Sequence, residues 1–141
     1  MYHPIFFSLY NLAHQSAAFD AMVIFTAVWL GNILICIAVL FLLFHHHRDI
    51  EPHTVRSMKQ KFKEIIRVFS TAFIAWLVGI ALKYLIASPR PFALYSSVQP
   101  LFSIIDPYGF PSWHATFFSA LAVAMYMNHK RIGIVFIVCA L

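Results

Sequence analysis

Residues 21–44 read AMVIFTAVWLGNILICIAVLFLLF, a run in which no side chain is charged. An α-helix rises about 1.5 Å per residue, so this run covers about 36 Å and can cross a hydrocarbon core about 30 Å thick. Further along the chain, long apolar stretches follow over 65–87 and 111–127, and a fourth run begins at Ile132 and reaches Leu141. We therefore expect an all-α polytopic membrane helical bundle with three complete spans and a partial fourth.

The composition of the whole chain agrees with this fold class. Apolar residues make up 62% and charged residues 11%, and mean hydropathy is +0.80. A soluble domain has about 45–50% apolar and about 25% charged residues. An ordinary soluble domain, a disordered chain and a secreted disulfide scaffold are therefore excluded. We expect residues 1–141 to form a single membrane-embedded domain, with Cys36 and Cys139 as free thiols inside apolar runs.

The positions of the basic residues predict how the chain is oriented. Residues 45–67 carry six Lys or Arg, 128–131 carry two, and 88–110 carry one. By the positive-inside rule, the first two segments are cytoplasmic and the third is external. The net charge of +5 is thus explained by basic residues in the cytoplasmic segments of a membrane protein, and we expect no nucleic-acid partner. The N-terminus is then external, where residues 1–15 have the apolar spacing of an amphipathic interfacial helix.

Two further expectations concern the helix ends. Apolar residues at helical spacing over 55–69 predict a juxtamembrane helix that continues into the second span without a break. The fourth apolar run, at 132–141, covers only about 15 Å. A chain end at that depth would leave carbonyl groups without partners. We therefore expect the sequence to be incomplete at its C-terminus, with the missing residues carrying the fourth helix to the external side.

Two cations fall at the predicted external face. Lys83 lies near the external end of the second span, and Arg90 follows in the loop, directly before Pro91. A guanidinium presents a planar fork to phosphate, and an ammonium adds a point charge. Taken alone, Lys83 is better explained by snorkelling to the interface. Taken together, the pair predicts an anion site.

A second group of residues lies where the third span begins, in the tetrapeptide Pro111-Ser112-Trp113-His114. Free N–H groups in the first turn of a helix, together with the helix dipole, attract anions. The Ser112 hydroxyl can donate to a phosphate oxygen, and His114 can transfer a proton near neutral pH. The alternative is that Ser112 caps the helix and His114 is an interfacial histidine. Because both groups map to the external face, we favour a site for a lipid phosphate.

Other polar residues have simpler interpretations. Asp106 could orient His114 or raise its pKa, but a solvated turn residue ahead of Pro107 is the favoured interpretation. His45, His46, His47 and His53 suggest a metal at first sight. Adjacent histidines seldom all face one ion, so we favour an interfacial polar cluster and predict no metal site.

The order and spacing of these residues resemble a known family. The pattern Lys-x6-Arg-Pro, starting at Lys83, followed by Pro-Ser-x-His, ending at His114, is similar to the first two signature motifs of the type 2 phosphatidic acid phosphatase superfamily. The resemblance covers roughly residues 60–141. The segment 11–20 is also similar to the start of the bacterial undecaprenyl-diphosphatase branch.

The resemblance implies roles for residues at the matching positions. Lys83, Arg90, Ser112 and the backbone N–H of Trp113 would bind the phosphoryl oxygens, and His114 would be the general acid that protonates the leaving oxygen. The family mechanism implies a phosphohistidine intermediate and no metal or other cofactor. The family most often has Gly where Trp113 stands, so the indole bears on specificity.

The resemblance also implies a part that residues 1–141 do not contain. The nucleophilic His belongs to a third motif, Ser-Arg-x5-His-x3-Asp, which is absent from this sequence. It would follow the fourth helix at its external end. These 141 residues alone are therefore expected to be inactive.

Two functions of different classes follow. The first is an integral phosphatase of the bacterial plasma membrane that hydrolyses a lipid phosphate or diphosphate at the external face. Undecaprenyl diphosphate is the first choice of substrate, and phosphatidic acid or phosphatidylglycerol phosphate comes next. The second is a non-catalytic membrane protein that binds anionic lipid or a partner. The coding sequence beyond codon 141 discriminates between them.

Overall fold

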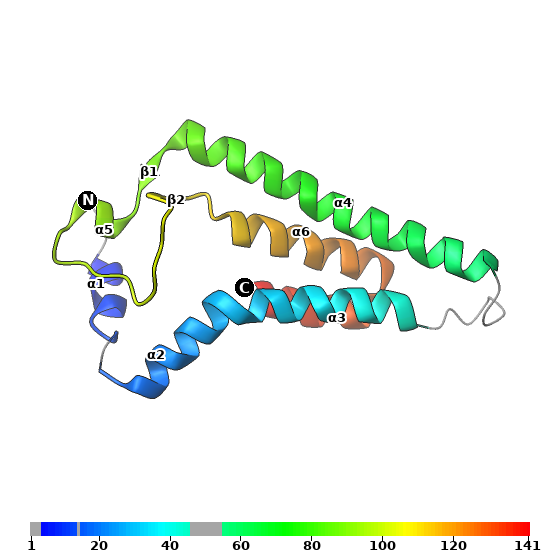
Figure 1. Cartoon of the computed structure of the whole chain (residues 1–141), viewed down its shortest axis with the longest axis horizontal. Coiled ribbons are helices and arrows are strands. Elements are labelled where there is room, and N and C mark those ends of the chain that lie inside the picture. The colour runs from blue at the N-terminus through cyan, green and yellow to red at the C-terminus, as the bar shows by residue number, and fades with distance from the viewer. Residues whose placement is uncertain (1–3, 14, 46–54) are drawn as a thin grey trace.

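The computed structural model describes residues 4–13, 15–45 and 55–141, and most of them are helical. Long helices lie lengthwise beside one another, while a loop and short helices gather at one end (Figure 1). In chain order, the elements are α1 (Pro4–Tyr10), α2 (Ala17–Ile24), the π-helix η1 (Phe25–Trp29), α3 (Leu30–Phe44), α4 (Val55–Ile86), β1 (Ser88–Pro89), α5 (Pro91–Leu94), β2 (Tyr108–Phe110), α6 (Trp113–Asn128) and α7 (Lys130–Ala140). The all-α class is confirmed except for one pair of very short strands.

The first long helix is continuous but bent. It runs through α2, η1 and α3, and the change of direction lies near η1 (Figure 1). The Thr26 hydroxyl donates to the carbonyls of Met22 and Val23 at 3.1 and 2.9 Å. A hydroxyl that bonds back to the preceding turn and a wide π-turn are both known causes of bending. The predicted span over 21–44 is therefore a helix with a bend in its first half.

The second long helix, α4, has 32 residues and no interruption. The prediction that the basic segment continues into the second span is thus confirmed. Lys61 lies in that basic segment, and its Nζ donates to the carbonyl of Leu43 at 2.8 Å, at the end of α3. A basic side chain there complements the partial negative charge of a helix C-terminus.

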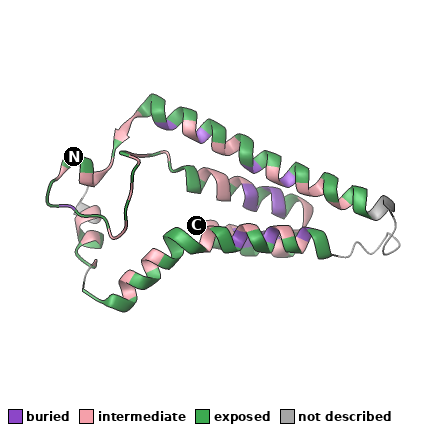
Figure 2. Ribbon diagram, in the orientation of Figure 1, coloured by how far each residue is buried: buried purple, intermediate pink, exposed green. Residues whose placement is uncertain are grey.

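A narrow core joins α3, α4, α6 and α7. Its fully buried members include Leu42, Val68, Leu121, Met125 and Phe136. Figure 2 shows the buried residues along the sides that the helices turn toward one another. Helices α4 and α6 pack closely at Gly79, since a Cβ there would lie 2.5 Å from Thr116 Oγ1. Small residues allow such contacts between helix backbones.

The outer faces of the long helices are apolar and exposed. Leu85 is 80% exposed, Ile74 60% and Phe44 78%. A continuous apolar surface of this kind is costly in water and is the normal surface of a helix in lipid. The segments Ala17–Phe44 and Met58–Ile86 are each long and apolar enough to cross a membrane.

The predicted third and partial fourth spans correspond to helices α6 and α7, which have 16 and 11 residues. Both are shorter than the two candidate spans Ala17–Phe44 and Met58–Ile86, so their passage through the membrane stays a prediction. The polar turn expected over 128–131 is shorter than predicted, because α6 ends at Asn128 and α7 begins at Lys130. His129 between them binds Glu64 of α4, with Nε2 and Oε1 2.6 Å apart.

The N-terminal and histidine predictions are covered only in part. The described helix in the 1–15 segment is α1, which is shorter than expected. Of the four histidines at 45–53, the structure describes His45, whose ring lies 4.7 Å from that of Phe41 and 4.6 Å from that of His129. The other three lie outside the described residues. Within the described part of the chain, no group of three metal-binding side chains comes together.

Candidate functional site

The short strand pair holds the two sequence motifs together. β1 and β2 are antiparallel, with Ser88 opposite Phe110 and Pro89 opposite Tyr108. The pairing is extended by the N–H of Arg90, which donates to the carbonyl of Pro107 at 2.8 Å. Since β1 follows α4 and β2 precedes α6, the pairing brings the end of α4 close to the start of α6. The sequence alone predicts only a loop here.

Lys83 is buried in the last turn of α4, with 2% of its surface exposed. Its ammonium pairs with the carboxylate of Asp106 in the loop before β2. A buried ammonium needs such a partner, because burial removes the water that would otherwise stabilise the charge. Snorkelling of Lys83 to the interface is therefore the wrong interpretation.

The interpretation of Asp106 as a solvated turn residue is also wrong. Asp106 binds both Lys83 and the N–H of Tyr108, which donates to Oδ1 at 3.0 Å. Burial acts to raise the pKa of Asp106. The hydrogen bonds from Lys83 and Tyr108 and the charges of Lys83 and Arg90 outweigh it, so the pKa lies below its usual value. Asp106 is thus an anion at neutral pH, and it fixes the position of the Lys83 ammonium.

Arg90 lies directly beside the strand pair, as the residue that precedes α5. Its side chain packs toward Gly109 of β2, where an added Cβ would lie 3.5 Å from Arg90 Cγ. Its Nε is buried, and none of the residues that the structure describes accepts a hydrogen bond from it. An unsatisfied buried donor on a cation is costly for the folded protein, and an anionic ligand is the partner that would satisfy it.

Ser112, Trp113 and His114 form the first turn of α6. Ser112 is the N-cap, and its Oγ accepts from the N–H of Ala115 at 3.3 Å. The predicted alternative role of Ser112, capping the helix, is therefore confirmed, and its hydroxyl hydrogen can still donate to an anion. The indole of Trp113 stacks on the His114 ring with centroids 3.5 Å apart.

The His114 imidazole lies near the two cations. Lys83 and Arg90 are both close enough for their charges to act on the His114 ring. Among the described residues, none is hydrogen-bonded to that ring, so its nitrogens are available to a ligand. The structure therefore brings together Lys83 and Arg90 from one motif and His114 from the other, with Asp106 as an addition.

Comparisons with known proteins add no relative to this description. The chain matches no protein-family model, and neither the search of curated proteins nor the search of solved structures gave a match. The chemistry of the site therefore has to be inferred from its own residues.

Proposed function

We propose that this chain is the phosphate-binding part of an integral membrane phosphatase that acts on a lipid phosphate or diphosphate at the external face. The observation that carries the proposal is that Lys83, Arg90 and His114 share one end of the bundle. Two cations and one imidazole suit a phosphoryl group, whose charge spreads over its oxygens in the transition state. Undecaprenyl diphosphate is the first choice of substrate, on the resemblance of the sequence.

In this proposal, each side chain has a distinct role. Arg90 binds phosphoryl oxygens through its unsatisfied Nε. The Lys83 ammonium has three donors and can serve Asp106 and a phosphate together. The Ser112 hydroxyl and the Trp113 N–H at the start of α6 complete the cradle.

The chemical step needs a nucleophile from the third motif, which we propose follows Leu141. Its imidazole nitrogen attacks phosphorus while the bond from phosphorus to the leaving oxygen breaks. His114, in its protonated form, gives its proton to that oxygen. A water molecule then attacks the phosphohistidine and frees phosphate, so no metal or other cofactor takes part.

The test is phosphate release from undecaprenyl diphosphate by the protein extended through the third motif. Arg90→Ala and His114→Ala should each lower the rate on the order of a hundredfold or more. The control is Ile105→Ala, because Ile105 is 97% exposed and outside the site. Equal rates for all four proteins would contradict the assigned roles. Binding of the lipid without release of phosphate would favour the non-catalytic lipid-binding function instead.

A further inference from the structure

A cavity lies beside the site and shares one residue with it. Its volume is about 380 Å³, and α1, α2 and the segment 90–104 line it. This size falls within the range of about 300–1,000 Å³ that is usual for small-molecule sites. Most of the wall is apolar, with Phe6 and Phe19 from the N-terminal helices and Val98, Leu101 and Ile104 from the loop.

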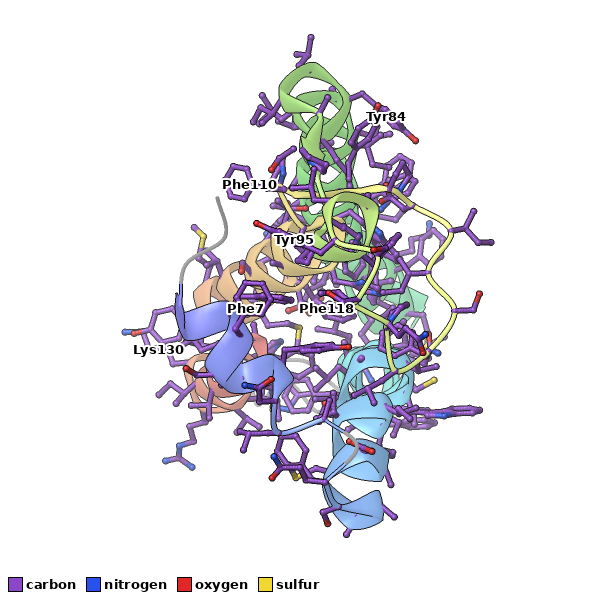
Figure 3. The ribbon with its side chains drawn as sticks, turned by 90° about the vertical axis from the view of Figure 1, so that its left-hand side faces the viewer. Phe7, Tyr84, Tyr95, Phe110, Phe118 and Lys130 are labelled. Carbon is purple, nitrogen blue, oxygen red and sulfur yellow. The ribbon has the colours of Figure 1, made fainter. Side chains whose placement is uncertain are left out.

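The wall is held in place by contacts between α1 and the loop. The rings of Phe7 and Tyr95 meet edge to face with centroids 5.6 Å apart. The Tyr10 hydroxyl accepts from the N–H of Gln99 at 3.0 Å and donates to the carbonyl of Ser97 at 3.4 Å. Figure 3 faces this end of the molecule and shows Phe7 and Tyr95 beside each other. The cavity is thus built by residues nearly 90 positions apart in the sequence.

Arg90 connects the cavity to the phosphate site. Among the described residues that line the cavity, it is the one with a charge, and this charge also acts on His114 and Asp106. Its Nε is buried and has no hydrogen-bond acceptor in the described part of the chain. An apolar cavity with an unsatisfied cationic donor at one side matches an amphiphile that has one anionic group and a hydrocarbon chain.

We propose that this cavity binds the hydrocarbon segment next to the phosphate of a single-chain lipid phosphate, with the phosphate on Arg90. The inference rests on the proposed function in taking phosphate as the head group. Burial of methylene groups supplies affinity in proportion to the area removed from water. The cavity therefore selects for a lipid with a long apolar chain over a short, water-soluble phosphate ester.

The test uses a dodecyl phosphate that carries a photoreactive diazirine at the end of its chain, with the protein in phosphatidylcholine vesicles. After irradiation, the label should be found by mass spectrometry in peptides from 6–23 and 91–104. Unlabelled dodecyl phosphate should compete at least about tenfold better than dodecanol, which has the chain but no phosphate. Label spread evenly over the apolar helices, or equal competition by dodecanol, would overturn the proposal.

Two neighbouring residues provide a matched pair of variants. Ile104 lines the cavity, while Ile105 is 97% exposed. Ile104→Trp should fill the cavity and lower labelling about tenfold, and Ile105→Trp should leave it unchanged. Arg90→Gln keeps the cavity and should remove the advantage of dodecyl phosphate over dodecanol as a competitor. This variant tests the proposal if Ile104→Trp fails to fold. Equal labelling of both tryptophan variants, when both are folded, would overturn the proposal.

Failure of this inference can be distinguished from failure of the proposed function. One outcome is hydrolysis that depends on Arg90 and His114 but is unaffected by Ile104→Trp, with no specific labelling. This outcome would contradict the proposed lipid site in the cavity and would still support the phosphatase. Specific labelling by the dodecyl phosphate probe, with no phosphate released by the extended protein, would support the cavity as a lipid-phosphate site and contradict the phosphatase.

Discussion

The ion pair of Lys83 and Asp106 shows how one charged residue depends on another. The Lys83 side chain is almost fully buried, whereas that of Asp106 is 31% exposed. Removal of one partner from such a pair leaves a charge without compensation, which is more costly than removal of both. The pair therefore holds the end of α4 next to the loop that leads into β2 and α6.

This dependence can be measured with a double-mutant cycle. Asp106→Asn and Lys83→Met should each destabilise the protein, with Asp106→Asn at about 1–3 kcal/mol because it leaves a buried ammonium unpaired. The double variant should be less destabilised than the sum of the two, by about 1 kcal/mol or more. The measurement is denaturant unfolding of the protein in neutral micelles. Strictly additive effects would mean that the two side chains do not interact.

Acid should weaken the same ion pair. The pKa of Asp106 is lowered in the folded protein, against about 3.9 in the unfolded chain. The stability that this difference supplies is fully present above about pH 5 and is lost as the pH falls through 3.9 toward the folded pKa. The stability difference between wild type and Asp106→Asn should therefore be largest at pH 7 and narrow at pH 3, in thermal melts. A difference that stays constant over this range would contradict an ionised Asp106.

Single residues could be predicted from the sequence where spacing carried the information. The positions of Lys83, Arg90 and His114 in two motifs, plus the orientation rule, were enough to place them together. Asp106 could not be found this way. Its contact with Lys83 spans 23 residues and depends on how the loop returns beside α4, which no local pattern encodes.

At the scale of elements, the site depends on how closely α4 and α6 pack. Gly79 lies against Thr116 one turn before Lys83 on α4, and Thr116 is two residues after His114 on α6. Any side chain at 79 has to displace the Thr116 side chain, which is bound to the carbonyls of Ser112 and Trp113 at 3.2 and 3.0 Å. The first turn of α6 is therefore coupled to this contact.

We expect Gly79→Ala to push the two helices apart. The protein should lose about 1–3 kcal/mol of stability, despite the better helix propensity of Ala. The distance between Lys83 and His114 should also change, so phosphate release by the protein extended through the third motif should slow. Ala81→Val is the control, because Ala81 is exposed on the same helix. A Gly79→Ala protein as stable as wild type would show that the helices do not pack this closely.

Helices could be predicted well from the sequence, and the loop could not. Apolar runs and charge boundaries located the continuous helix α2–η1–α3 and helices α4, α6 and α7 within a few residues. The bend at η1 and the β1–β2 pair were missed. The bend lies at a π-turn that contains Thr26, whose hydroxyl bonds back to the preceding turn. The strand pair has only two and three residues, too few for an alternating pattern.

Over the whole molecule, the two ends of the bundle differ in their charge. The start of α4, with Lys59, Lys61 and Lys63, lies at the end where α6 meets α7 (Figure 1). Lys83 and Arg90 lie at the opposite end, where Asp106 neutralises one of them. An excess of basic side chains at one end is the pattern that the positive-inside rule connects with the cytoplasm. By this rule, we expect the site to face the external side.

This orientation predicts which residues a membrane-impermeant maleimide reaches in intact cells. In a background with Cys36→Ser and Cys139→Ser, Ile105→Cys should react at once, because Ile105 is exposed beside the site. Lys59→Cys, exposed at the other end, should react only after the membrane is made permeable. The opposite result would place the phosphate site in the cytoplasm and remove an external lipid diphosphate as its substrate. Reaction of both residues in intact cells would mean that the two ends are not separated by a membrane, so that the apolar outer faces of α3 and α4 would need a protein partner to cover them.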